Sequence, residues 1–138
     1  MYNQSKNGYC YNHIGKIIDY QTPLKTCRHD SAVKVDLLSY DGKVLRFLEL
    51  KKRDSTETML RCVLEGYTYL KTADTEKLLS DFQLPPDTII KASPFVFSGS
   101  EQHKEFLENR PQLKKLMALL DSKPFFIKEN NNFYTVED

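Results

Sequence analysis

The sequence contains no long apolar run. None of its apolar stretches approaches the roughly 18 consecutive residues that a membrane-spanning helix requires. Residues 1–13 also lack the basic segment followed by an apolar segment that marks a secretory signal peptide. We therefore expect a cytoplasmic protein with no membrane partner.

The sequence also has few cysteines and almost no net charge. The three cysteines, Cys10, Cys27 and Cys62, are odd in number and have no CxxC spacing, which disfavours a disulfide scaffold and a structural zinc site. The net charge of +1 permits a nucleic-acid-binding surface but does not demand one. Apolar residues make up 40% of the 138 residues, which is enough for one packed core, so we expect a single domain over residues 1–138.

Two β-rich runs, residues 32–40 and 43–51, are separated by Asp41 and Gly42. Both separating residues tolerate a positive φ, which suits a two-residue type I′ turn. The pattern therefore predicts a β-hairpin.

This turn sets which residues of the hairpin face each other. Asp36 is expected opposite Phe47 and Lys34 opposite Glu49, all on one face of the sheet. Asp36 and Glu49 are then diagonal neighbours, and Lys51 points to the same side. The other face is almost entirely apolar, and we expect the core there, built on Val33, Val35, Leu37, Leu48 and Leu50.

The remaining segments alternate between strand and helix patterns. We predict strands over 14–21 and 88–98, helices over 55–72, 75–82 and 100–120 with a break at Pro111, and a terminal hairpin from 125–128 and 132–136. In the first helix, Asp54 and Glu57 form a capping box, and the apolar stripe comprises Leu60, Val63, Leu64 and Tyr67. This order predicts an α/β protein with a mixed sheet flanked by helices.

The acidic face of the hairpin suggests a metal site. The carboxylates of Asp36 and Glu49 could share one Mg²⁺ at bonds of about 2.0–2.1 Å. Such an ion polarises a phosphodiester and lowers the pKa of a bound water, while the Lys51 ammonium stabilises developing negative charge. The alternative is an ordinary charged sheet face with an ion pair between Lys34 and Glu49.

Residues 35–38 (VDLL) and 47–52 (FLELKK) resemble the PD-(D/E)XK nuclease superfamily, whose restriction-endonuclease-like fold has an αβββαβ core. The resemblance is strongest over residues 14–98, so the C-terminal helix and hairpin would be additions to that core. It implies that Asp36 and Glu49 are metal ligands, with the Leu50 carbonyl as a further ligand. Lys51 would be the catalytic lysine.

The sequence departs from the family pattern at several positions. No proline directly precedes Asp36, and no glutamate occurs before Glu49, so only Asp19 and Asp30 could replace the usual acid of the first helix. Related RecB-like nucleases carry Gln-x-x-x-Tyr on the helix after the third strand. Glu65 and Tyr69 have this spacing, but we expect them opposite the apolar stripe.

The resemblance implies a Mg²⁺-dependent nuclease acting on DNA, with Mn²⁺ as a substitute cation. Lys52, Arg53 and Arg28 could contact phosphates near the site. The alternative is a catalytically inactive nuclease-fold module with a role in nucleic-acid binding or protein assembly, as a homodimer or with a partner subunit.

Overall fold

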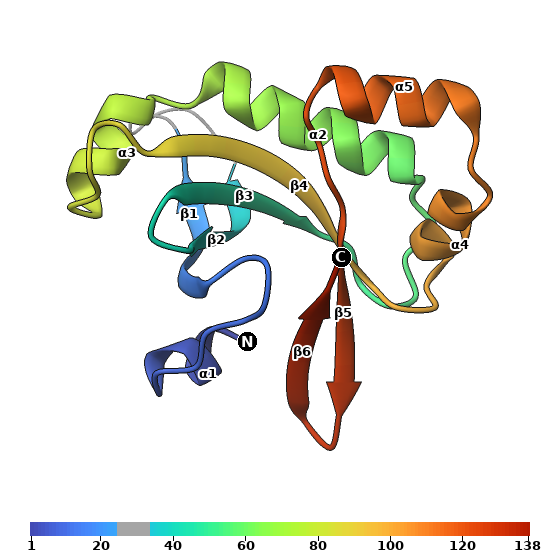
Figure 1. The fold of residues 1–138 in the computed structure, drawn as a ribbon, viewed down its shortest axis with the longest axis horizontal. Coiled ribbons are helices and arrows are strands. Elements are labelled where there is room, and N and C mark those ends of the chain that lie inside the picture. Colours follow the sequence, from blue (N-terminus) through green and yellow to red (C-terminus); the bar gives the residue numbers. More distant parts are fainter. Residues whose placement is uncertain (25–33) are drawn as a thin grey trace.

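The computed structural model describes residues 1–24 and 34–138, which form a mixed α/β structure (Figure 1). Its strands are β1 (Lys16–Pro23), β2 (Lys34–Tyr40), β3 (Val44–Leu50), β4 (Ile89–Phe97), β5 (Phe125–Asn130) and β6 (Phe133–Glu137). Its helices are α1 (Tyr2–Lys6), α2 (Met59–Thr72), α3 (Thr75–Asp81), α4 (Glu101–Leu107) and α5 (Pro111–Leu119). Among the described residues, none of the helices is long and apolar enough to cross a membrane.

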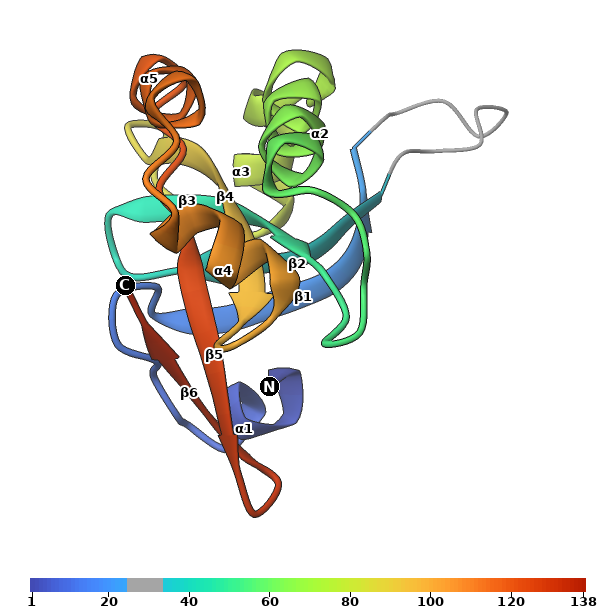
Figure 2. The ribbon, with the colours of Figure 1, turned by 90° about the vertical axis from the view of Figure 1, so that its right-hand side faces the viewer.

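The six strands form one mixed sheet in sequence order. The strands β1, β2 and β3 are antiparallel, β3 to β4 and β4 to β5 are parallel, and β5 to β6 is antiparallel. Each parallel step needs a crossover connection, which α2 and α3 provide first and α4 and α5 second. The sheet curls into a half-barrel, with α2 and α5 on one side and α1 on the other (Figures 1 and 2).

The predicted mixed sheet with flanking helices is confirmed, and so are most of its elements. The break at Pro111 separates α4 from α5, because proline suits the first turn of a new helix but not the interior of an old one. The terminal hairpin turns at Asn131 and Asn132, both with positive φ.

Both faces of the sheet are buried, so the expectation of a core on one face was wrong. Leu37 and Leu48 pack into a cluster with Phe95. Leu38 and Phe47, on the face expected to be charged, pack into a second cluster under the helices. A sheet with parallel crossovers buries both faces because the crossover helices cover one side while other segments cover the second.

The hairpin between β2 and β3 forms, but its predicted register was wrong by two residues. Leu38 pairs with Phe47. The Asp41 carboxylate accepts hydrogen bonds from the backbone N–H groups of Lys43 and Val44, at 2.9 and 2.8 Å. This side-chain turn adds residues to the connection between the strands.

The helix α2 begins later than its capping pattern predicted, because tertiary contacts hold the preceding segment extended. Its N-cap is Thr58, whose hydroxyl accepts a hydrogen bond from a first-turn amide at 3.1 Å. Before it, the buried side chain of Gln102 donates to the carbonyls of Ser55 and Glu57, at 3.0 and 2.6 Å. Glu57 therefore lies outside the helix and does not form a capping box.

The segment before β1 approaches the hairpin closely at Gly15. Its φ is 78°, and a Cβ at this position would overlap the carbonyl oxygen of Tyr40. Gly42 also has a positive φ, of 98°, but a Cβ there would meet no atom within 4 Å.

We expect Gly15→Ala to lower the free energy of unfolding by about 2 kcal/mol or more, through backbone strain combined with the overlap at Tyr40. The matched change Gly42→Ala should cost about 1 kcal/mol, since it carries the φ strain alone. Urea denaturation of both variants measures the difference. Equal losses would contradict the close approach.

Candidate functional site

The strands β2 and β3 separate at the end that carries the acidic residues. Their pairing continues as far as Leu37 opposite Leu48. Beyond it, the Leu50 N–H donates to Asp36 Oδ2 at 2.9 Å. The paired register ends before Asp36 and Glu49. The charge of Asp36 still raises the pKa of Glu49, so the two carboxylates are near enough to interact.

Lys51 is the centre of the site. Its ammonium donates to Glu49 Oε1 at 3.0 Å and to Glu65 Oε2 at 2.7 Å, and it forms an ion pair with Glu57. Lys51 and Glu49 are only 7% and 4% exposed. The ion-pair partner of Glu49 in the described residues is therefore Lys51, and not Lys34 as in the alternative interpretation.

The helix α2 turns a different face to the sheet than its apolar stripe predicted. Leu60, Leu64 and Tyr67 are exposed. Gly66 lies on the buried face, where a Cβ would come within 3.2 Å of Ala92 in β4. The buried residues of α2 are Met59, Cys62, Val63, Gly66 and Tyr69, so Val63 is the one residue of the predicted stripe that is buried.

This rotation brings Glu65 and Tyr69 into the site, contrary to expectation. Tyr69 is buried, and burial together with the neighbouring Glu49 carboxylate raises the pKa of its hydroxyl. Glu65 also accepts from Arg61 Nε at 3.0 Å. The spacing of Glu65 and Tyr69 was the sequence signal for these residues. The contact of Glu57 with Lys51 had no such signal, because Glu57 was expected inside the helix.

Burial and neighbouring acids change the protonation of the cluster. Burial raises the pKa of Glu49 to about 8, and the neighbouring Glu65 carboxylate and the charge of Asp36 act in the same direction. Burial also raises the pKa of Asp36, against the opposing effect of the Leu50 N–H. Partial burial would raise the pKa of Glu65, but hydrogen bonds from Glu49, Lys51 and Arg61 lower it to about 2.

The residues fit a divalent cation bound between Asp36 and Glu49. Glu49 Oε2 is buried and has no hydrogen-bond partner in the part of the chain that the structure describes. The site holds more acids than bases, since Lys51 and Arg61 face the four carboxylates of Asp36, Glu49, Glu57 and Glu65. A cation would satisfy the buried oxygen and offset the excess charge.

The composition of the site suits Mg²⁺. Across residues 1–24 and 34–138, no group of three or more His, Cys, Asp and Glu side chains forms a ready metal cage. Mg²⁺ does not require one, because it usually keeps several waters and binds through one or two carboxylates. Asp36, Glu49 and the Leu50 carbonyl would then be its protein ligands.

The basic residues after β3 lie at the edge of the site. Arg53 Nη2 donates to Glu129 at 2.7 Å, and its guanidinium lies 4.6 Å from the centre of the Phe97 ring. Lys52 is exposed. Arg28, the third predicted phosphate contact, lies outside the described residues.

The acid that the family pattern expects on the first helix is not on α1, whose residues 2–6 include no Asp or Glu. Of its two possible substitutes, Asp19 accepts a hydrogen bond from Thr22 Oγ1 at 2.7 Å. Asp30 lies outside the described residues.

Comparisons with protein-family models, curated proteins and solved structures found no match. The function of the site therefore has to be argued from its own geometry and chemistry.

The raised pKa of Glu49 predicts how stability depends on pH. Glu49 holds its proton to about pH 8 in the folded state but to about 4.5 in the unfolded chain. Between these two pKa values the folded state binds more protons than the unfolded chain. The stabilising contribution of Glu49 to the free energy of unfolding is therefore fully present below about pH 4.5 and is lost as the pH rises to about 8. Glu49→Gln should abolish this part of the slope, as measured by urea unfolding at several pH values.

The control for this experiment is Glu137→Gln, which removes an exposed acid that pairs with Lys128 on the terminal hairpin. Its unfolding free energy should follow the wild-type pH dependence. If Glu49→Gln also follows it, Glu49 does not carry the bound proton.

Removing the ammonium of Lys51 should strongly destabilise the fold. Lys51→Met leaves the surrounding carboxylates uncompensated, and breaking a buried pair in this way costs about 3–5 kcal/mol. The loss should be larger at pH 8 than at pH 5, where protonation neutralises Glu49. Lys77→Met, which breaks an exposed pair with Asp81, should cost at most about 1 kcal/mol. Similar losses in both variants would contradict a buried cluster.

Proposed function

We propose that this chain is a Mg²⁺-dependent nuclease of the PD-(D/E)XK type that hydrolyses phosphodiester bonds in DNA, with Mn²⁺ as a substitute cation. The observation that carries the proposal is the convergence of Asp36, Glu49 and Lys51 at the point where β2 and β3 separate. The order of elements supports it. An Asp on the second strand and Glu-x-Lys on the third are followed by α2 and by β4, which is parallel to β3.

In the proposed site, Asp36, Glu49 and the Leu50 carbonyl would hold the cation. When bound, Mg²⁺ would polarise the scissile phosphate and lower the pKa of a water molecule. Glu49 has to release its proton before it can bind a cation, and its pKa of about 8 means that cation binding strengthens as the pH rises towards that value.

Lys51 would stabilise the negative charge that develops on the phosphate during attack. Its ammonium is held in place by Glu49 and Glu65. Tyr69 is buried next to Glu49, whose carboxylate raises the pKa of the Tyr69 hydroxyl in addition to the effect of burial. Glu65 and Tyr69 are therefore positioning residues, while Lys51 is proposed to contact the reacting group.

Lys52 and Arg53 follow Lys51 directly in the chain. We propose that these two residues and Arg28 bind phosphates of the DNA, since contacts of Lys and Arg with phosphates position the backbone without reading its sequence. The proposed enzyme would act in the cytoplasm, in accord with the buried free thiol of Cys62.

A second candidate function is a catalytically inactive module that binds nucleic acid or assembles with a second copy or a partner subunit. The engagement of Lys51 by three carboxylates favours it, because an ammonium so occupied is less available to a phosphate. The salt dependence of DNA binding distinguishes a nucleic-acid-binding module from a protein-assembly module. A slope of log K against log salt near zero excludes phosphate contacts and leaves a role in protein assembly.

Purified protein should cleave DNA in the presence of Mg²⁺ or Mn²⁺ and not in EDTA. Glu49→Gln should lower the cleavage rate by at least about 100-fold, because it removes a cation ligand and cannot become an anion. Glu137→Gln provides the matched control and should retain full activity. Cleavage is followed on labelled single- and double-stranded DNA, with RNA tested in parallel.

The proposal is wrong if none of these substrates is cleaved with either cation and if isothermal titration detects no Mg²⁺ binding that Glu49→Gln removes. Binding of DNA without cleavage would instead support the inactive module.

A further inference from the structure

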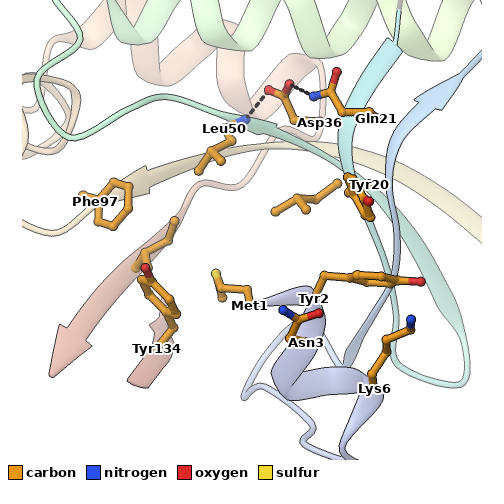
Figure 3. A pocket seen from close by; sticks show the side chains of 12 residues that line it. Met1, Tyr2, Asn3, Lys6, Tyr20, Gln21, Asp36, Leu50, Phe97 and Tyr134 are labelled. Atoms are coloured by element: carbon orange, nitrogen blue, oxygen red, sulfur yellow. Dashed lines mark hydrogen bonds between the residues drawn. The ribbon is translucent and has the colours of Figure 1, made fainter. Parts of the chain in front are cut away.

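A cavity of about 560 Å³ lies on the α1 side of the sheet, and Asp36 forms part of its lining (Figure 3). Its volume is within the range of about 300–1,000 Å³ that is usual for small-molecule sites. A cation held by Asp36 and Glu49 would account for their carboxylate oxygens but not for the aromatic lining of this cavity. The cavity therefore calls for a separate explanation.

Aromatic rings line the cavity on two sides. Figure 3 shows Phe97 and Tyr134 on one side and Tyr2 and Tyr20 on the other. The rings of Tyr2 and Tyr20 lie 5.0 Å apart at an angle of 58°. Tyr20 is 55% exposed, which leaves much of its surface free to contact a ligand. Such rings bind flat aromatic groups such as nucleobases by stacking.

Cations lie beside rings on both sides. Lys6 Nζ is 5.3 Å from the centre of the Tyr2 ring, and the Arg53 guanidinium is 4.6 Å from that of Phe97. An apolar ligand would gain nothing from these charges, whereas a nucleotide combines a flat base with an anionic phosphate.

Asp36 connects the cavity with the proposed cleavage site. It lines the cavity, and its carboxylate accepts a hydrogen bond from Leu50, the residue between Glu49 and Lys51. A strand whose phosphate is held at Asp36 through the proposed cation would therefore have the cavity directly beside it.

We propose that this cavity binds one unpaired nucleobase of a single-stranded substrate, next to the phosphate that is cleaved. This inference rests on the proposed function and names its substrate class. A base inside a duplex is stacked and paired, and extruding it costs a few kcal/mol, so single strands and frayed ends should bind better than intact duplexes.

The test measures binding in EDTA, where the proposed reaction cannot occur. Fluorescence anisotropy with a labelled single-stranded DNA gives the Kd of wild type, Tyr20→Ala and Tyr20→Phe. The DNA has about 12 nucleotides, which is long enough to span one binding site. Tyr20→Ala should weaken binding by about 5- to 100-fold, which corresponds to the loss of one stacked base. Tyr20→Phe should bind as wild type does, because the ring remains.

The control is Tyr67→Ala on α2. Tyr67 is also exposed, and Lys71 Nζ lies 5.4 Å from its ring centre. Tyr2 and Lys6 are paired in the same way, with the lysine four residues after the tyrosine. Because α2 covers the other side of the sheet, Tyr67→Ala should leave the Kd unchanged (Figure 1). Thermal melts of all variants show whether each remains folded.

Replacing single nucleotides by abasic sites provides a second, independent measurement. An abasic site at one position of the DNA should weaken its binding to the wild-type protein. The same abasic site should not further weaken binding to Tyr20→Ala. The inference is overturned if Tyr20→Ala and Tyr67→Ala have the same Kd, if no abasic position matters, or if an intact duplex binds as tightly as the single strand.

These results are separable from those for the proposed function. Binding that depends on Tyr20 in a protein that cleaves nothing supports the base site and removes the nuclease. Cleavage that is indifferent to Tyr20→Ala supports the nuclease and overturns the base site.

Discussion

The burial of one ammonium group, that of Lys51, constrains much of this structure. A charge taken out of water costs several kcal/mol unless other charges and hydrogen bonds compensate it. Its compensation comes from three segments: Glu49 in β3, Glu57 in the connection that follows, and Glu65 in α2. The cluster therefore ties the central strand to its crossover helix, and the packing of α2 on β4 and the position of the acidic site are coupled.

The separation of β2 from β3 has two consequences. It leaves the Asp36 carboxylate free to accept from the Leu50 N–H, near enough to the buried cluster for its charge to act on Glu49. It also places Asp36 in the wall of the aromatic cavity. The backbone group freed by the separation is satisfied by the Asp36 carboxylate itself, so the strands can part without an unsatisfied N–H at Leu50. The proposed cation site and the proposed nucleobase site thus share Asp36.

The side-chain alternation of the hairpin was predicted better than its register. Side chains of a strand alternate with a period of two, so a slip of two residues keeps Leu37, Leu48 and Leu50 together. Val35, predicted on the same face, packs instead with Leu38 and Phe47. The helical residues were predicted less well, because the apolar stripe of Leu60, Leu64 and Tyr67 is exposed.

The sequence alone determined the alternation of strands and helices and the hairpin, since both depend on local periodicity and turn chemistry. The tertiary structure decided which face of α2 is buried: Met59, Cys62, Val63 and Tyr69 pack inward together with Gly66, which lies close to Ala92. It also decided the start of this helix, through the buried hydrogen bonds of Gln102. The aromatic cavity was also decided by the tertiary structure, because its rings come from segments far apart in the chain and no local pattern brings them together.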